Sequence, residues 1–407
     1  MTPGVVTRSE LRLVFLIASA IFISNIDRGN LAIAGPLVRS EFHLSATSFG
    51  ILISCFYWTY TACINPAAWV ADRFGARRVL ALCVALWSVA TGLTGLATGF
   101  IGLLLVRLLL GVGESGVWPC SSSLVASEVS PAFRGRANAW MAISIALGPA
   151  VGTFAGGLLM GRFGWRTVFM GLGAISLAWL WPWFAVESNP QHRVETEVSE
   201  PSVPLKRILR ERALWGSTLA NVSAGYTYYF MISWMPIFLV QGRGLSLGSM
   251  GQLIGAAYLL RAGSSWISGP IIDRWINAGR SATVIHKGIL GFGSIAIIVC
   301  LAGFGLGSSS VVIAGLFVYE FFAGLNTTAT GSLIQLLAGP RATGTWVGFS
   351  NGAASLAGIV APAVTGLIID ITGGFVGAFA LAAAMATLGF IGWVFVVPRA
   401  TAIEWGR

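Results

Sequence analysis

Apolar runs of about twenty residues recur along almost the whole chain, and they constrain the possible fold more than any other feature. An α-helix needs about 20 apolar residues to cross the hydrocarbon core of a bilayer, because each residue advances it by about 1.5 Å. The strands of a membrane barrel would alternate between apolar and polar residues, and these runs do not. The sequence therefore predicts an all-α membrane protein.

The composition supports a chain that resides in lipid. Apolar residues make up 56% of the chain and charged residues only 10%, whereas soluble domains carry about 25% charged residues. So little charge cannot cover a fold with a water-compatible surface. We attribute the net charge of +10 to topology and lipid headgroups, and we expect the lipid bilayer, but no nucleic acid, as a partner.

The charged and Pro/Gly-rich breaks between the runs predict twelve spans. They cover residues 11–33, 46–69, 79–99, 101–124, 137–160, 166–186, 214–239, 247–271, 283–304, 309–336, 344–368 and 374–397. The first run has no small-residue cleavage site, so we expect the first helix to be retained. Cytoplasmic loops retain Lys and Arg, and with the N-terminus inside only Arg39, Arg162, Arg166 and Arg243 fall on the far side. We therefore expect a multi-pass monomer of the bacterial inner membrane, with both termini in the cytoplasm.

The longest polar interruption, from Glu187 to Arg212, separates six spans from six. It predicts a six-helix bundle over 1–186, a cytoplasmic linker over 187–212 and a second six-helix bundle over 213–407. The loops after spans 2 and 8 carry Asp72-Arg73 and Asp273-Arg274, at equivalent positions about 200 residues apart. This repeat indicates two pseudo-symmetric halves, with a substrate site near the midplane between them.

The loop after span 2 also carries a resemblance to a known family. Its Asp72, Arg73, Gly75, Arg77 and Arg78 closely resemble the loop signature of the major facilitator superfamily, although Ala68 replaces its leading glycine. Two runs, Asn25–Leu31 and Arg107–Pro119, resemble the narrower anion:cation symporter family of sugar-acid, phthalate and sialic-acid carriers. The resemblance implies the twelve-helix major facilitator fold and uptake of an organic anion coupled to protons. It assigns Arg28 to the substrate.

Six charged residues lie inside the predicted spans, where each costs at least about 2.5 kcal/mol near the bilayer centre unless it pairs or faces water. They are Asp27, Arg28, Arg107, Glu114, Arg261 and Glu320. Three acids balance three bases, so these residues are expected either to form pairs or to build a site.

Arg28 and Arg107 are candidate ligands of a substrate carboxylate, because a guanidinium group meets a carboxylate with two parallel hydrogen bonds. The alternative is that they neutralise Asp27 and Glu114 and only hold helices together. Asp27, Glu114 and Glu320 are the candidates for proton coupling, since an anion that competes for an arginine leaves its acid partner more ready to bind a proton.

Arg261 departs from the typical pattern of that family, in which this part of span 8 is apolar or small. By the internal repeat, Arg261 and Tyr60 occupy equivalent depths, as do Tyr258 and Tyr57. These four residues are candidate substrate ligands from both halves. The alternative for Arg261 is a structural pair with Glu320.

Trp118 and Asn351 complete the predicted substrate site. Asn351 matches an amide that the family uses, and Asn326 could also bind substrate hydroxyls, although membrane amides more often bond a neighbouring helix. Pro149 stands where sugar-acid carriers tend to have a polar residue, and together with Trp118 it favours a less hydroxylated, more apolar anion, although such aromatics more often pack against lipid or core. The loop residues Asp72, Arg73, Asp273 and Arg274 are predicted to gate the cytoplasmic side, because a carboxylate can cap a helix N-terminus in the other half.

These features predict a proton-coupled symporter of a small organic anion, a carboxylate, that works by alternating access. The alternative is a proton-driven exporter of a drug-like or cationic compound, which would need unpaired acids facing an apolar cavity. The five cysteines show no paired or metal-binding spacing, and no Walker loop or Ser/His/Asp set is present. We therefore expect no metal, no cofactor beyond the coupling proton and no enzymatic activity. A membrane sensor would carry a large soluble domain, and the sequence shows none.

Overall fold

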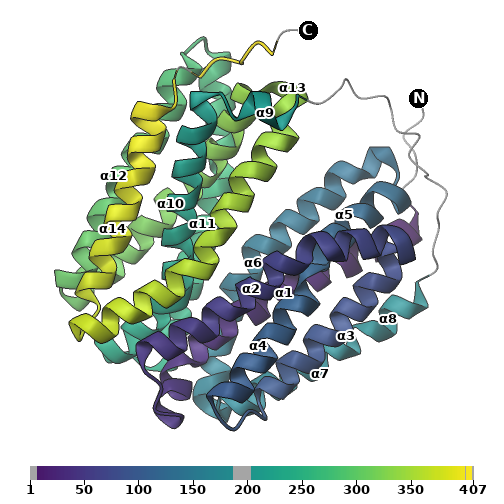
Figure 1. Cartoon of the computed structure of the whole chain (residues 1–407), viewed down its shortest axis with the longest axis vertical. Helices are drawn as coiled ribbons and strands as arrows, with labels where there is room; N and C mark the ends of the chain where they lie inside the picture. Colours follow the sequence, from purple (N-terminus) through teal and green to yellow (C-terminus); the bar gives the residue numbers. More distant parts are fainter. Residues whose placement is uncertain (1–6, 187–202, 399, 406–407) are drawn as a thin grey trace. The chain divides into compact units, whose positions relative to one another are not determined.

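The computed structural model describes residues 7–186, 203–398 and 400–405, and within these ranges the chain is helical without strands (Figure 1). The first helices are α1 (Arg8–Glu41), α2 (Ala46–Phe74), α3 (Ala76–Thr94), α4 (Phe100–Ser115), α5 (Val117–Glu128), α6 (Pro131–Phe163), α7 (Trp165–Ala178) and α8 (Leu180–Ala185). They are followed by α9 (Leu205–Ile208), α10 (Arg212–Ile237), the π-helix η1 (Phe238–Gly242), α11 (Leu247–Asn277), α12 (Ala282–Leu306), α13 (Ser309–Thr372), α14 (Val376–Ile391) and the π-helix η2 (Gly392–Val396).

The helices match the twelve predicted spans once three breaks are taken into account. α4 and α5 together form one span over Phe100–Glu128, and α7 and α8 form another over Trp165–Ala185. α13 covers two spans that meet at Gly339, which has the non-helical angles φ 64° and ψ 173°. Glycine adopts this conformation without strain, and the following Pro340 disfavours a helical residue before it. The chain therefore bends between the tenth and eleventh spans.

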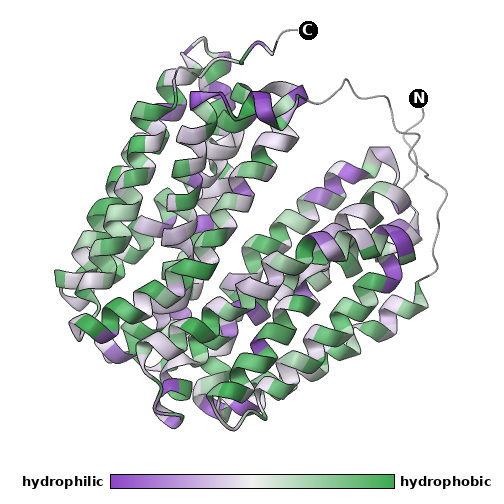
Figure 2. Ribbon diagram, viewed as in Figure 1, coloured by the Kyte–Doolittle hydropathy of each residue, from purple (hydrophilic) through white to green (hydrophobic). Residues whose placement is uncertain are grey.

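Nine helices within the described residues are long and apolar enough to cross a membrane. α10 and α11 are long enough but more polar. In α10 the polar residues Asn221, Ser223, Thr227 and Tyr228 line an internal cavity, so their polarity serves an interior surface. Figure 2 shows apolar residues along most of the length of the helices, with hydrophilic residues gathered at α9.

The chain divides into two compact units. Unit 1 comprises Met1–Glu197 and Leu239–Gly255, and unit 2 comprises Val198–Phe238 and Ala256–Arg407. Of the predicted linker over 187–212, residues 187–202 lie outside the described residues, and the remainder contains α9.

Two glycines allow α4 to approach both of its neighbours in unit 1. A Cβ atom on Gly111 would overlap backbone atoms of α2, and one on Gly113 would lie 2.7 Å from the backbone nitrogen of Trp87 in α3. Such close approach requires residues without a side chain, and it is a common way to join membrane helices. Gly111 lies about one turn before Glu114, so this packing fixes the place of the Glu114 carboxyl group.

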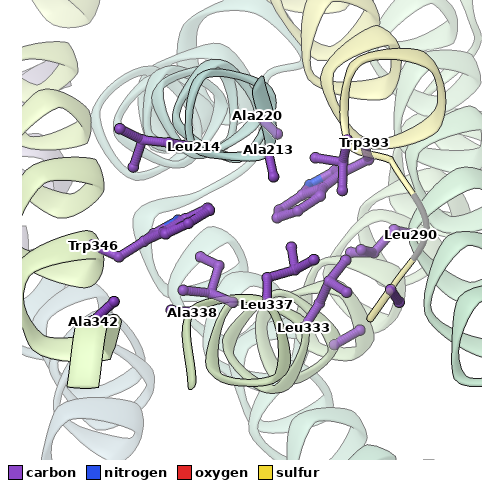
Figure 3. Close-up of a cluster of buried hydrophobic side chains, with 14 of the residues drawn as sticks. Ala213, Leu214, Ala220, Leu290, Leu333, Leu337, Ala338, Ala342, Trp346 and Trp393 are labelled. Atoms are coloured by element: carbon purple, nitrogen blue, oxygen red, sulfur yellow. The ribbon is translucent and has the colours of Figure 1, made fainter. Parts of the chain in front are cut away.

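Buried apolar side chains of α10, α12, α13 and η2 form one hydrophobic cluster in the core of unit 2 (Figure 3). They include Ala213, Leu214, Ala220, Leu290, Leu333, Leu337, Ala338, Ala342, Trp346 and Trp393. Trp346 also donates its indole N–H to the hydroxyl of Ser217 at 3.0 Å. Because lipid is as apolar as these side chains, close packing and such hydrogen bonds hold the helices together. Trp393 lines the cavity of unit 2 as well, so this core supports the cavity wall.

Candidate functional site

In unit 1, three helices hold the guanidinium group of Arg28. Arg28 of α1 donates Nε–H to Glu114 Oε2 of α4 at 2.6 Å. Its Cζ atom lies 4.6 Å from the centre of the Tyr60 ring and 5.7 Å from that of Phe56, both on α2. The Arg28 side chain is still 24% exposed, whereas that of Glu114 is fully buried. The group is therefore held between a carboxylate and two rings, with part of it open to an anion.

Asp27 is separate from this pair, although it precedes Arg28 in the sequence. Neighbouring residues of a helix point about 100° apart, and Asp27 faces α3. Its Oδ2 accepts a hydrogen bond from the Thr91 hydroxyl at 3.2 Å. Its Oδ1 is buried without a hydrogen-bond partner in the part of the chain that the structure describes. Of the two acids that sequence analysis offered as partners of Arg28, the structure selects Glu114.

Arg107 of α4 is buried and, among the described residues, forms no ion pair with a carboxylate. Its side chain is 3% exposed, and its Nε atom has no hydrogen-bond partner. Glu114 and Asp27 act on it through space as nearby charges. A buried guanidinium group without an ion-pair partner is costly.

Unit 2 contains a similar cluster. Arg261 of α11 donates an Nη1 hydrogen to Glu320 Oε2 of α13 at 3.3 Å, and its Cζ lies 5.1 Å from the centre of the Tyr228 ring of α10. The Arg261 side chain is 25% exposed and that of Glu320 is 1% exposed. Buried Tyr258 and Tyr319 lie within electrostatic reach of the same pair. Arg261 and Glu320 thus form the ion pair that was predicted as the alternative role of Arg261.

A cavity of about 320 Å³ within unit 2 is bordered by Arg261. Its polar lining comprises Asn221, Ser223, Thr227, Tyr228, Ser294, Tyr319, Asn326, Thr327, Thr330 and Asn351. The Oδ1 atom of Asn326 is buried and has no hydrogen-bond partner among the described residues. The structure thus brings the predicted residues Arg261 and Asn351 to one polar cavity.

The other predicted ligands are more scattered. Tyr57 is buried and packs edge-on against Phe56, with ring centres 4.9 Å apart. Tyr57 lies within electrostatic reach of Arg28 and Arg107, so it belongs to the cluster of unit 1. Trp118, near the start of α5, is 46% exposed.

The predicted gating residues lie at helix ends. Asp72 and Arg73 are exposed in the last turns of α2, and Asp273 and Arg274 are exposed near the end of α11. Arg73 lies over the Trp69 ring, with its Cζ 5.6 Å from the ring centre. Their role as latches stays a prediction.

Sequence analysis did not single out three residues of these clusters. Thr91 is one of several hydroxyl side chains in an apolar span and carries no signal of its own. Asn30 follows Arg28 by two residues, is fully buried, and neither polar atom of its amide has a partner among the described residues. Tyr228 lies 200 residues after Arg28, one residue short of the offset between Asp72 and Asp273, so the internal repeat points to its neighbour Tyr229.

Two helical units, each with an arginine–glutamate pair buried among membrane-spanning helices, define a multi-pass membrane transporter. Residues 17–345 match the model of the Major Facilitator Superfamily, and the chain belongs to this family. The prediction of an all-α transporter of this fold, without enzymatic activity, is thereby confirmed.

Relatives are similar along almost their whole length. A probable sulfoacetate transporter of Cupriavidus necator is 27% identical, with 93% of this chain and 92% of the relative covered. The hexuronate transporter of Bacillus subtilis is 29% identical, with 98% of each chain covered. The D-galactonate transporter of Escherichia coli is 27% identical, with 97% of this chain and 96% of the relative covered. These relatives carry organic acid anions, in agreement with the resemblance to the anion:cation symporters.

Solved structures share the fold. A bacterial homologue of the human lysosomal transporter Spinster, in an inward-facing and unoccupied conformation, superimposes with a TM-score of 0.79 at 20% identity, covering 96% of this chain and 94% of the other. The nucleoside transporter NupG, as its D323A mutant, gives a TM-score of 0.74 at 12% identity, covering 95% and 100%. At these identities the likeness extends to the fold alone.

Proposed function

We propose that this protein is a proton-coupled symporter that imports a small organic anion, a carboxylate or a related acid, across the bacterial inner membrane. The observation that carries the proposal is the pair of arginines in unit 1. Arg28 is partly exposed and holds Glu114, while Arg107 is buried without an ion pair among the described residues. The relatives named above, which transport sulfoacetate, hexuronate and galactonate, support an acid as substrate.

The geometry suggests how an anion binds. Within the described residues Glu114 uses only the Nε–H of Arg28, so the terminal N–H groups remain for a second acid group. A planar guanidinium group binds a carboxylate through two parallel hydrogen bonds. The rings of Tyr60 and Phe56 support the guanidinium face and limit its rotation. Arg107 adds a second positive charge for the same ligand.

The same contacts support coupling of anion uptake to proton uptake. An anion that binds Arg28 competes with Glu114, and a displaced carboxylate in a buried site is costly unless it takes up a proton. Asp27 is a second proton carrier, because one of its oxygens is buried without a partner in the described part of the chain. Protons are the coupling ion in this scheme. A cation exporter fits less well, because two arginines would repel its substrate from these acids.

We propose transport by alternating access, which the family fold supports, because transporters of this fold work by rocking of two helical bundles. We further propose that the protein is a monomer. The distribution of Lys and Arg supports a topology with both termini in the cytoplasm.

Uptake into proteoliposomes tests the proposal. Labelled galactonate, glucuronate and sulfoacetate are supplied outside, with the interior more alkaline than the exterior. We expect uptake of at least one acid above that of empty liposomes, and its loss in Arg28→Gln. Arg12→Gln, which removes an exposed arginine from the same helix, is the matched control and retains uptake. Uptake of none of these acids, or equal uptake by Arg28→Gln, would contradict the proposal.

A further inference from the structure

The cluster of unit 2 resembles that of unit 1, except that the arginine and the aromatic ring lie on exchanged helices. In unit 1 the arginine is on α1 and the ring beneath it is on α2. In unit 2 the ring is on α10 and the arginine is on α11. Tyr60 and Arg261 are separated by the same 201 residues as Asp72 and Asp273 of the internal repeat, and Arg28 and Tyr228 by 200 residues, within one residue of that offset. The contact between cation and ring is therefore kept in both halves, although its partners have changed places.

The acid of the cluster is repeated as well. Glu114 of α4 and Glu320 of α13 lie on the fourth and tenth spans, and each is buried against its arginine. Both helices approach the adjacent span through a glycine. A Cβ atom on Gly324 would overlap the Arg261 carbonyl of α11, just as one on Gly111 would overlap the backbone of α2. In each unit a glycine within about one turn of the glutamate, before Glu114 and after Glu320, thus brings the helix that carries the acid against its neighbour.

The bond to Glu320 is the looser of the two. The distance from Arg261 Nη1 to Glu320 Oε2 is 3.3 Å, whereas that from Arg28 Nε to Glu114 Oε2 is 2.6 Å. The longer contact is the weaker one, so less interaction energy is lost when an anion replaces Glu320. The polar cavity of unit 2 lies against this arginine and offers three amides as further hydrogen-bond donors and acceptors. One of them, Asn326, has a buried oxygen without a partner among the described residues. An inert ion pair does not require a lined cavity or an unpartnered amide.

We propose that this cavity is a second acid-binding site, in which an acid group of a small organic anion replaces Glu320 at Arg261. The inference rests on the proposed function, and it adds a site in unit 2. The displaced Glu320 takes a proton from solution, so that one anion and one proton bind together and the net charge of the cavity is unchanged. The acid group belongs either to the transported substrate, as its second acid group, or to a separate anion.

The groups that face this pair define its response to pH. Tyr228 lies on α10, Tyr258 on α11 and Tyr319 on α13, and all three act on the pair through space. Cys300 of α12 acts on Tyr319. α14 contributes no titratable side chain. Glu320 is thus the one carboxyl group of the described residues within electrostatic reach of Arg261, and proton uptake on binding is assigned to it.

Calorimetry on the purified full-length protein tests the inference with two probes that share a hydroxylated six-carbon skeleton. Galactonate carries one acid group and galactarate carries two. We expect Arg261→Gln to weaken binding of galactarate by about tenfold or more, the loss of a charge-assisted contact. Weakening confined to galactarate identifies the second acid group of one substrate, whereas equal weakening of both probes identifies a site for any single acid group. Arg280→Gln, an exposed arginine of unit 2, is the matched control.

Glu320→Gln provides the second variant, since it keeps the size of the side chain. It should tighten binding and lower the proton uptake that accompanies it by about one proton per anion, measured in buffers of different ionisation enthalpy. An inert structural pair predicts instead a less stable protein with unchanged affinity and unchanged proton uptake. Binding that responds to Arg28→Gln but to neither Arg261→Gln nor Glu320→Gln overturns this inference and leaves the proposed function intact. Binding that responds to Arg261→Gln but not to Arg28→Gln contradicts the proposed role of Arg28 and leaves the site in unit 2 intact.

Discussion

The Nε atom of Arg28 lies 2.6 Å from Oε2 of Glu114 on another helix, although the acid next to it in the sequence is Asp27. This choice separates the roles of the two acids. In the proposed mechanism, an incoming anion displaces Glu114 from Arg28, whereas Asp27 keeps its contact with Thr91. The first prediction therefore concerns Glu114.

Glu114→Gln should separate substrate exchange from proton-driven accumulation. Glutamine keeps the shape of the side chain but cannot carry a proton. Exchange of labelled for unlabelled anion between equal pools needs no net proton movement, so we expect it to continue in proteoliposomes. Accumulation driven by a pH gradient should be lost. If the variant still accumulates anion up such a gradient, Glu114 has a structural role, and coupling lies with Asp27 or Glu320.

Arg107→Met should increase stability while it abolishes transport. Methionine has a similar length and no charge, and a charged group near the bilayer centre costs at least about 2.5 kcal/mol when it lacks a partner. We expect a higher midpoint of thermal unfolding for the purified variant without substrate, together with loss of anion uptake. A destabilised variant would contradict this prediction. It would show that the charge of Arg107 stabilises the protein, although its Nε atom is buried without a hydrogen-bond partner among the described residues.

Tyr60 should act through its ring and not through its hydroxyl group. The Arg28 Cζ atom lies 4.6 Å from the ring centre, a distance at which a cation–π contact contributes about 0.5–2 kcal/mol. Tyr60→Phe should therefore leave the Kd for the anion close to that of the wild type. Tyr60→Leu should raise the Kd by about 2- to 30-fold. An equal loss in both variants would assign the hydroxyl group to substrate binding.

Gly111→Ala should disturb the site through helix packing. The added methyl group would overlap the backbone of α2, and backbone atoms cannot move aside as a flexible side chain can. Overpacking of this kind costs about 1–3 kcal/mol, so we expect a lower unfolding midpoint and slower uptake. Gly171→Ala is the control, because nothing lies within 4 Å of a Cβ atom at that position of α7. It should unfold at the wild-type temperature or slightly above it.

The helices were predictable from the sequence, because each span needs a long apolar run in lipid. The ends of the helices were less so. α1 continues to Glu41 although its predicted span ends at residue 33, since hydropathy marks the depth of the membrane while backbone hydrogen bonds extend a helix beyond it. The bend at Gly339 was placed correctly between two spans.

The charged residues of the site were predictable, but their partners were not. Intramembrane charges stand out against an apolar background, so Arg28, Arg107, Glu114 and Arg261 were all identified. Which acid meets which base depends on how neighbouring helices are rotated, and sequence spacing fixes rotation only within one helix. Thr91 and Asn30 were missed for the same reason, because a small polar residue acquires its role only from the helix that faces it.

Proton movement together with the anion tests the central claim most directly. A pH-sensitive dye is trapped inside proteoliposomes that start without a pH gradient, and the membrane voltage is clamped with potassium and valinomycin. When an acid that the wild-type protein transports is added outside, the interior should acidify in step with entry of the labelled anion. Entry of the anion without any change in interior pH would contradict proton-coupled symport by this protein.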